Sequence, residues 1–295
     1  MTVRLVLNGE YRTGTTILYR IIKDSYPVLV PLYEPTTYIL KDHFDRILKK
    51  RKTDSYLHGF DPYEYLLSLT IEELKILEKY YELLRRDPYE LLFGKIVNDL
   101  VRELNEIKNR EYFIQPNNWH FKLKELDCPV IHIVRNPIDQ YFDYCKPFLR
   151  ALPDKILRVM LGKDKDKRFE RQFFLDLEFR ALAKKFKLPT NIDPFSKFLY
   201  YYAYCNYYAC QSSNVYVICY EHLVKEPKRT LIKISQYAKI PLVLNFTKLI
   251  TDKHLYRFSK SFAKATYEKL RELDLLDMVK TFLPKDVYDK CFGNL

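Results

Sequence analysis

The stretch "VRLVLNGEYRTGTTILYRII", residues 3–22, decides the fold. An apolar run, a polar turn and an amphipathic pattern follow one another, which predicts a strand, a loop and a helix. Gly9 and Gly14 have the spacing of a phosphate-binding loop, G-x-x-x-x-G-K-[ST], but Thr15 stands where the lysine would grip the β- and γ-phosphates. The helix start still predicts an anion site, and ATP or GTP hydrolysis is disfavoured. The alternative is a tight turn that merely precedes a buried helix.

Further apolar runs predict a sheet of which this strand is one member. They are "PVLVPLY" (27–33), "VIHIV" (130–134) and "VYVICY" (215–220), and polar turn residues and helical patterns separate them. This alternation is typical of an α/β fold with a mostly parallel central sheet flanked by helices. Pro31 suits an edge position or a strand end in such a sheet.

Helical patterns fill the remainder of the chain. They cover about 62–108, with Thr70 and Glu73 spaced as a capping box, about 148–211, and the segment from Lys264 onward. The tyrosine-rich stretch 198–208 is expected to lie in the core or to form a helix-packing face, in preference to a carbohydrate platform. We find no internal repeat and no flexible linker, so we expect one domain over 1–295 with helical insertions at about 40–110 and 148–211.

The composition favours a globular protein that attracts anions. The chain has 295 residues, is 47% hydrophobic and carries a formal net charge of +12. Such a charge fits nucleotides, acidic glycans, nucleic acid or a membrane surface and does not choose among them. The charged stretch 163–172 has mixed signs, which is typical of a solvated segment and disfavours a nucleic-acid partner.

The sequence also makes expectations about compartment and metals. The start of the chain does not resemble a signal peptide, and no apolar run reaches the roughly 18 residues of a spanning helix. The six cysteines are scattered and form no C-x-x-C pair, which favours buried free thiols. A disulfide between Cys205 and Cys210 is the alternative. We therefore expect a cytoplasmic protein without a metal site.

The opening loop and the segment after it resemble sulfotransferases that use 3′-phosphoadenosine-5′-phosphosulfate (PAPS). In that family the loop reads [KR]-[ST]-G-[ST]-[ST], and the carbohydrate-acting branch continues to a strand that ends in Glu-Pro. Here "YRTGTTILYRII" precedes "YPVLVPLYEP". The resemblance implies a P-loop fold, PAPS as donor and PAP as product. It also implies that Arg12 neutralises charge on the bridging oxygen of the 5′-phosphosulfate, and that the loop holds this group through Thr13, Gly14, Thr15 and Thr16.

A second motif, "VIHIVRNPIDQYFDY" (130–144), resembles the family segment whose arginine binds the 3′-phosphate. By this resemblance Arg135 is that residue, and its fork suits a phosphate dianion. A pair between Arg135 and Asp139 across one helical turn is the local alternative. The family usually has a serine eight residues after the arginine, where this chain has Asp143. A carboxylate at that position would repel the phosphate unless it points away or is paired.

Two later segments complete the resemblance. "VYVICYEHLVKEP" (215–227) is similar to a family segment whose role is structural, beside the nucleotide. "TDKHLYRFSKSF" (251–262) falls where related enzymes have a loop over the nucleotide, which makes Ser259 a candidate contact, together with Lys253, Arg257 and Lys260. The helical regions between these motifs match no family that we can name.

Sulfuryl transfer needs a base for the acceptor and positive charge around the leaving oxygens. Glu34 is the first candidate base, since carbohydrate-acting relatives place this glutamate near the acceptor. His120 is the second candidate because imidazole titrates near neutrality, although a lone histidine is more often structural. Trp119, the sole tryptophan, suits stacking on a sugar or an adenine, or the core.

Three functions follow from these observations. The first is transfer of a sulfuryl group from PAPS to a hydroxyl or amine acceptor, such as a glycan or a small metabolite. The second is non-catalytic binding of a nucleotide or polyanion on the same fold, with Asp143 as the sign of a changed 3′-phosphate site. The third is a P-loop kinase, which the missing lysine disfavours. The acceptor and the oligomeric state are not legible in the sequence.

Overall fold

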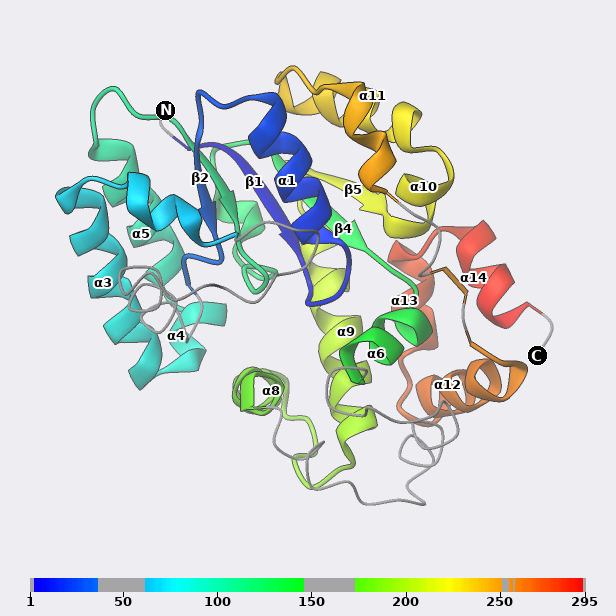
Figure 1. Cartoon of the computed structure of the whole chain (residues 1–295). Coiled ribbons are helices and arrows are strands. Elements are labelled where there is room, and N and C mark those ends of the chain that lie inside the picture. The colour runs from blue at the N-terminus through cyan, green and yellow to red at the C-terminus, as the bar shows by residue number, and fades with distance from the viewer. Residues whose placement is uncertain (1–2, 37–61, 146–172, 251–254, 257, 294–295) are drawn as a thin grey trace.

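The computed structural model describes residues 3–36, 62–145, 173–250, 255–256 and 258–293 (Figure 1). Within them lies a parallel sheet with the strand order β2-β3-β1-β4-β5. Its strands are β1 (Val3–Gly9), β2 (Val30–Tyr33), β3 (Tyr112–Gln115), β4 (Val130–Val134) and β5 (Val215–Cys219). The predicted α/β class with a parallel central sheet is confirmed.

One strand was not foreseen from the sequence. β3 contains only "YFIQ", and all of its residues are buried between β1 and β2. Four residues that end in Gln115 are too few to show a clear strand pattern, because burial here comes from the two neighbouring strands. The predicted strand at 27–33 is β2, which begins at Val30, and Pro31 lies on the edge strand as expected.

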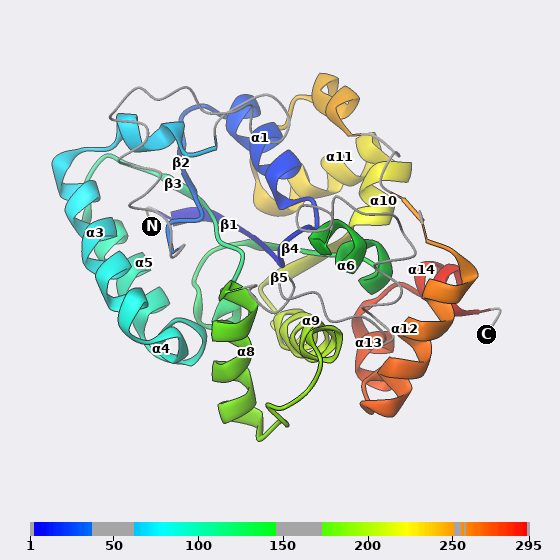
Figure 2. The same ribbon diagram turned by 60° about the horizontal axis from the view of Figure 1, so that its bottom comes forward.

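Helices cover both faces of the sheet (Figures 1 and 2). In these views α1 and α11 lie on one face, and α5 and α9 lie on the other. The helices are α1 (Thr15–Ser25), α3 (Ile71–Arg86), α4 (Pro88–Phe93), α5 (Ile96–Glu106), α6 (Pro137–Cys145), α8 (Phe173–Phe186), α9 (Pro194–Cys210), α10 (Tyr220–Lys225), α11 (Pro227–Ala238), α12 (Lys260–Glu272), α13 (Leu276–Phe282) and α14 (Lys285–Phe292). Short 3-10 turns cover Glu64–Ser68 (η2), Leu123–Glu125 (η3) and Leu244–Leu249 (η4).

Local sequence explains where the main helices begin. Thr70 and Glu73 form the predicted capping box at the start of α3, each satisfying a backbone N–H of the other. The Asp193 side chain accepts from the Ser196 N–H, and Pro194 occupies the first turn of α9. Tyr201 and Tyr202 of α9 are buried in the core, whereas Tyr200, Tyr204 and Tyr207 pack partly buried against it and Tyr208 is 39% exposed. This helix joins the sheet to α13.

The described residues bear on the cysteines, on membrane spans and on metal sites. The cysteines at 128, 205, 210, 219 and 291 are free thiols. The alternative disulfide between Cys205 and Cys210 is therefore not formed. No helix in the described ranges is both long and apolar enough to cross a bilayer. Across the same ranges, no group of three or more His, Cys, Asp or Glu side chains is placed to hold a metal ion. The proposed insertions at about 40–110 and 148–211 lie partly outside the described residues.

Candidate active site

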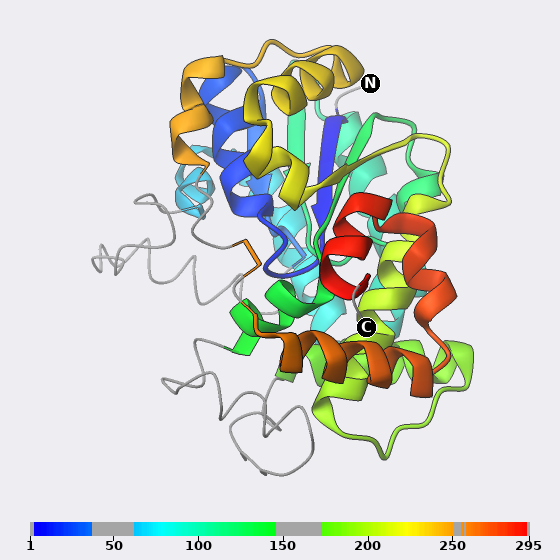
Figure 3. The same ribbon diagram turned by 90° about the vertical axis from the view of Figure 1, so that its right-hand side faces the viewer.

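The loop that follows β1 adopts the tight conformation expected of an anion-binding turn. Arg12 has φ 70° and Gly14, the N-cap of α1, has φ 95°, so both occupy the left-handed region. A Cβ atom at Gly14 would lie 2.5 Å from the Tyr220 ring, which leaves no room for a side chain. The first N–H groups of α1 have no partner within the helix, and the loop gathers them at the carboxyl edge of the sheet (Figure 3).

The loop threonines take different positions. The Thr13 hydroxyl donates to the Glu10 carbonyl at 2.7 Å and is fully buried, so it stabilises the loop from inside. The Thr15 hydroxyl donates to Asn117 Oδ1 at 3.2 Å, and the Thr16 hydroxyl bonds to the Tyr33 hydroxyl at 2.8 Å. Thr16 and Arg12 are the partly exposed side chains among the predicted loop contacts. They are the ones best placed to meet a ligand.

Arg135 lies beside the loop, immediately before α6. Its Nη1 donates to the Arg12 carbonyl at 2.7 Å and lies 2.8 Å from Asp143 Oδ2. Its guanidinium lies over the Tyr220 ring, 4.6 Å from the ring centre. The structure thus brings Arg135 and Asp143 to the phosphate loop and to each other. Asp139 accepts hydrogen bonds from Asn136 and from the Tyr256 backbone.

The segment predicted to cover the nucleotide is partly described. Lys253 and Arg257 lie outside the described residues. The Tyr256 N–H donates to Asp139 Oδ2 at 2.6 Å, which ties this segment to α6. Ser259 is exposed and is the N-cap of α12, a helix that packs against α6. Ser259 therefore lies on an element next to the loop, but no hydrogen bond between its side chain and the loop residues is seen.

Glu34 directly follows β2 at the same edge of the sheet. It has φ 45°, and its N–H donates to the Gln115 carbonyl at 2.7 Å. The carboxylate is half-buried and accepts hydrogen bonds from the Tyr63 hydroxyl at 2.6 Å and from Asn117 Nδ2. Desolvation raises the pKa of Glu34, and the hydrogen bonds and the Arg12 charge counter it in part. A carboxylate with a raised pKa is a better proton acceptor near neutrality.

Asn117 connects the loop to Glu34 and was not foreseen from the sequence. Its Oδ1 accepts from Thr15 and from Gln115 Nε2, while its Nδ2 donates to Glu34. The signal that could have revealed it was the strand "YFIQ", since residues just past the carboxyl end of a parallel strand face the ligand edge. Because that strand was missed, Asn117 was missed with it.

His120 is buried in a polar network below the loop. Its Nδ1 lies 3.0 Å from Asn8 Nδ2, and its Nε2 lies 3.0 Å from the Asn117 carbonyl. Asn8 Nδ2 also reaches His132 Nδ1 at 3.1 Å, and Asn8 Oδ1 accepts from the Trp119 N–H. Asn8 therefore donates one hydrogen to each histidine, which leaves both imidazoles neutral with the proton on Nε2. Burial lowers the pKa of His120 well below its usual value.

Trp119 is fully buried, and its Nε1 donates to the Thr36 hydroxyl at 3.0 Å. Of the two roles considered from the sequence, the structure places it in the core. It supports the turn that carries Asn117 and His120, because its backbone N–H donates to Asn8 at the end of β1.

Two more buried carboxyls stand near this network. Glu10, at the start of the loop, accepts from Gln140 Nε2 at 2.9 Å and from Asn206 Nδ2 at 2.8 Å, and burial raises its pKa to about 8. Glu178 accepts from the Tyr201 hydroxyl and from Asn118, and burial raises its pKa to about 7. Neutral amides and hydroxyls supply these bonds, and among the described residues no lysine or arginine pairs with either carboxyl to keep it ionised.

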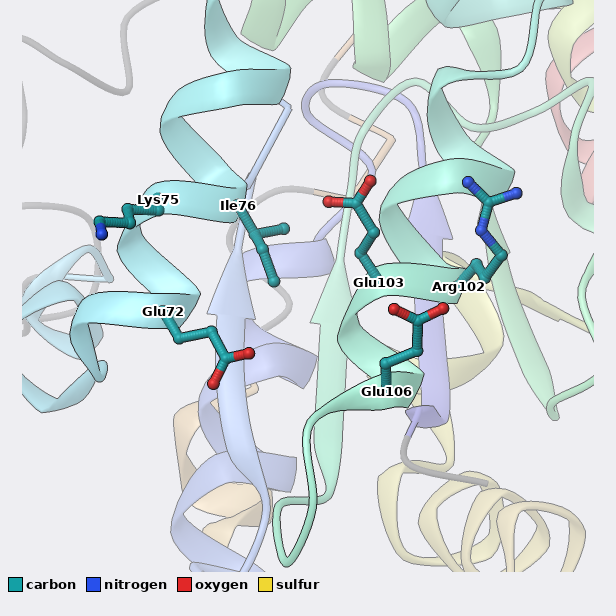
Figure 4. Close-up of a pocket in the computed structure, with 6 residues that line it drawn as sticks. All are labelled: Glu72, Lys75, Ile76, Arg102, Glu103 and Glu106. Atoms are coloured by element: carbon teal, nitrogen blue, oxygen red, sulfur yellow. The ribbon is translucent and has the colours of Figure 1, made fainter.

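A surface pocket lies elsewhere, between α3 and α5 (Figure 4). Its lining residues are Glu72, Lys75 and Ile76 of α3 and Arg102, Glu103 and Glu106 of α5. A neighbouring pocket reaches Arg110, just before β3 begins. Both therefore lie toward the amino ends of the strands, whereas parallel sheets bind ligands at the carboxyl ends. Their mixed charges fit a solvated helix surface.

Comparison with known proteins gives matches that extend over most of the chain. No family model matches it. An uncharacterized protein from Archaeoglobus fulgidus is 29% identical, covering 96% of this chain and 98% of the relative. A solved sulfotransferase from Alicyclobacillus acidocaldarius is 13% identical with a TM-score of 0.41, covering 94% of this chain and 96% of that one. A mouse sulfotransferase complexed with PAP is also 13% identical, with a TM-score of 0.40, covering 100% of this chain and 89% of that one.

Proposed function

We propose that this protein is a sulfotransferase, which moves a sulfuryl group from PAPS to a hydroxyl or amine acceptor. The observation that carries the proposal is the phosphate-type loop that lacks a lysine and contains Arg12 at φ 70°. The Arg12 carbonyl accepts a hydrogen bond from Arg135, and the Arg12 charge favours the ionised form of Glu34. A cation, a set of backbone N–H groups and a base candidate thus meet at one edge of the sheet.

Each group has a place in an in-line displacement. The acceptor oxygen or nitrogen forms a bond to sulfur while the bond between sulfur and the bridging phosphate oxygen breaks, and the acceptor proton passes to Glu34. Arg12, Thr16 and the N–H groups of the loop stabilise the charge that develops on the leaving phosphate. Asn117 fixes the positions of Glu34 and Thr15 relative to each other, because its side-chain amide is hydrogen-bonded to both.

The remaining predicted residues take supporting roles in this proposal. His120 is a positioning residue rather than the base, because both of its ring nitrogens are hydrogen-bonded inside the protein and its exposed fraction is 1%. Ser259, at the start of α12 next to α6, would contact the nucleotide. We also propose that the chain acts as one domain in the cytoplasm.

The test follows sulfur-35 from labelled PAPS, with γ-labelled ATP in a parallel reaction, using panels of hydroxyl and amine acceptors. We expect label transfer only from PAPS, and we expect the Arg12→Ala variant to lose at least about 100-fold in rate, with a smaller loss of nucleotide affinity. Arg20→Ala is the matched control, since Arg20 pairs with Asp24 on the surface of α1.

A non-catalytic nucleotide-binding protein is the second candidate, favoured by the carboxylate of Asp143 at the side chain of Arg135. Tight PAP binding without transfer to any acceptor would support it. Wild-type transfer by the Arg12→Ala variant would refute the role of Arg12, and label transfer from ATP alone would point to a kinase.

A further inference from the structure

We infer that Asp143 sets the donor specificity of the loop, such that a phosphate on the ribose 3′ position adds little affinity for the nucleotide. This inference rests on the proposed function, because it concerns the nucleotide donor of the same site. It assigns the donor class as adenosine 5′-phosphosulfates, with or without the 3′-phosphate.

The ion pair stands at the loop itself. Arg135 Nη1 and Asp143 Oδ2 are 2.8 Å apart, and the side chains are only 3% and 14% exposed. The same Nη1 donates to the Arg12 carbonyl, and the guanidinium lies over Tyr220, whose ring also touches the Gly14 position. Arg135 is thus packed into the wall of the loop and shares its charge with a carboxylate.

Burial makes this pair selective against a second anion. Two opposite charges in a poorly solvated place attract each other more strongly than they do in water, and breaking such a pair is costly. A 3′-phosphate bound at Arg135, where the resemblance to sulfotransferases puts it, would have to displace Asp143 from Arg135 or lie beside the carboxylate and be repelled by it. Either arrangement cancels most of the attraction that a free arginine offers to a phosphate dianion.

A carboxylate suits an unmodified ribose instead. Its oxygens accept hydrogen bonds from hydroxyl groups, whereas an arginine fork suits a phosphate. Dinucleotide-binding sheets use the same choice of residue type, with an acidic side chain for a free ribose hydroxyl and an arginine for a ribose phosphate. With Asp143 in place, this region offers a carboxylate that can accept a hydrogen bond from a ribose hydroxyl. Arg135 alone would offer a site for a phosphate.

The experiment is calorimetric titration with AMP and with adenosine 3′,5′-bisphosphate. For the wild-type protein we expect dissociation constants within about threefold of each other. Asp143→Ser and Asp143→Asn should each tighten bisphosphate binding about tenfold or more relative to AMP binding, which is the scale of one charge-assisted hydrogen bond. Asp24→Asn, in the surface pair on α1, is the matched control and should change neither constant.

The outcomes separate this inference from the proposed function. Wild-type protein that binds the bisphosphate tenfold or more tightly than AMP would overturn the role of Asp143 and leave sulfuryl transfer from PAPS standing. Because that comparison needs no variant, it holds even if a substitution impairs folding. Folded Asp143 variants without any gain for the bisphosphate would overturn it equally. Binding of neither nucleotide would refute the proposed function and this inference together.

Discussion

Buried carboxyl groups at the two ends of the sheet have different partners and opposite pKa shifts. At the amino ends, Glu73 accepts from both Arg110 Nε at 2.9 Å and Nη2 at 3.0 Å, and from the Tyr112 hydroxyl at 2.6 Å. Burial opposes ionisation, but these hydrogen bonds outweigh it and lower the pKa of Glu73. At the carboxyl ends, Glu10 has only amide donors among the bonds seen, and burial raises its pKa to about 8.

The difference separates a structural site from the site that we propose to be functional. The glutamate at the amino ends is matched by an arginine and by the cap of α3, so its hydrogen-bonding capacity is used by the fold. At the carboxyl ends, burial raises the pKa of Glu10, Glu34 and Glu178 together beside a loop that is shaped for an anion. Perturbed groups gathered at a ligand edge are typical of active sites.

The largest effect is expected from a substitution that adds a side chain at Gly14 in the loop. Gly14→Ala places a methyl group 2.5 Å from the Tyr220 ring at a backbone angle that side chains rarely adopt. We expect nucleotide affinity to fall by about 100-fold or more, since both the loop path and the Arg135 stack must shift. Titration calorimetry measures this loss, and Lys108→Ala at the amino ends is the control. Unchanged affinity in Gly14→Ala would separate the loop from ligand binding.

The reverse result is expected at the amino ends. Arg110→Ala leaves the buried carboxylate of Glu73 without its cation, so the free energy of unfolding should fall by about 2 kcal/mol. Nucleotide affinity should stay within about twofold of wild type. Urea denaturation and titration of the same variant check both values. Loss of binding at unchanged stability would mean that the two ends do not divide their roles in this way.

Stability should fall between pH 6.5 and 8 because of the carboxyl-end glutamates. The folded pKa of Glu10, about 8, exceeds the unfolded value of 4.5, so its contribution is complete at low pH and is lost as the pH rises toward 8. His132, with a folded pKa of about 4, loses its contribution only as the pH falls below 6.5. We expect a decrease of about 1–2 kcal/mol over this window, measured by urea denaturation at each pH.

Two variants sharpen that pH comparison. Glu10→Gln should flatten the profile between pH 6.5 and 8, because its side chain no longer ionises. Glu73→Gln should lower stability at every pH and keep the slope, since the pKa of Glu73 is already low in the fold. An unchanged slope in Glu10→Gln would show that Glu10 is ionised in the folded protein at neutral pH.

The smallest effect is expected at the cap of α3. Thr70→Ala removes the hydroxyl that accepts from the Glu73 N–H, and it should cost about 1 kcal/mol. Thermal denaturation is sensitive enough for this change, and sulfuryl transfer should be unaffected. A cost several times larger would indicate that the cap also determines how Glu73 meets Arg110.

Local sequence predicted the loop and most of the sheet, but it did not predict the partners that meet there. The periodicity around Gly14, and the capping pair of Thr70 with Glu73, depend on neighbours in the chain and could be seen directly. Asn117 could not, because its strand has four residues and its contacts to Glu34 and Thr15 span the sheet. The pairing of Arg135 with Asp143 needed the helix geometry of α6, which brings the two side chains together.

Hydrogen–deuterium exchange with and without saturating AMP or adenosine 3′,5′-bisphosphate tests the central claim most directly, because it reports which end of the sheet holds the nucleotide. We predict slower exchange in residues 9–18 and 135–143, where the loop, Arg135 and the start of α1 meet. Peptides from 70–76 and 102–110, around the pockets between α3 and α5, should not change. Protection confined to those pocket peptides, with none in the loop, would contradict the account.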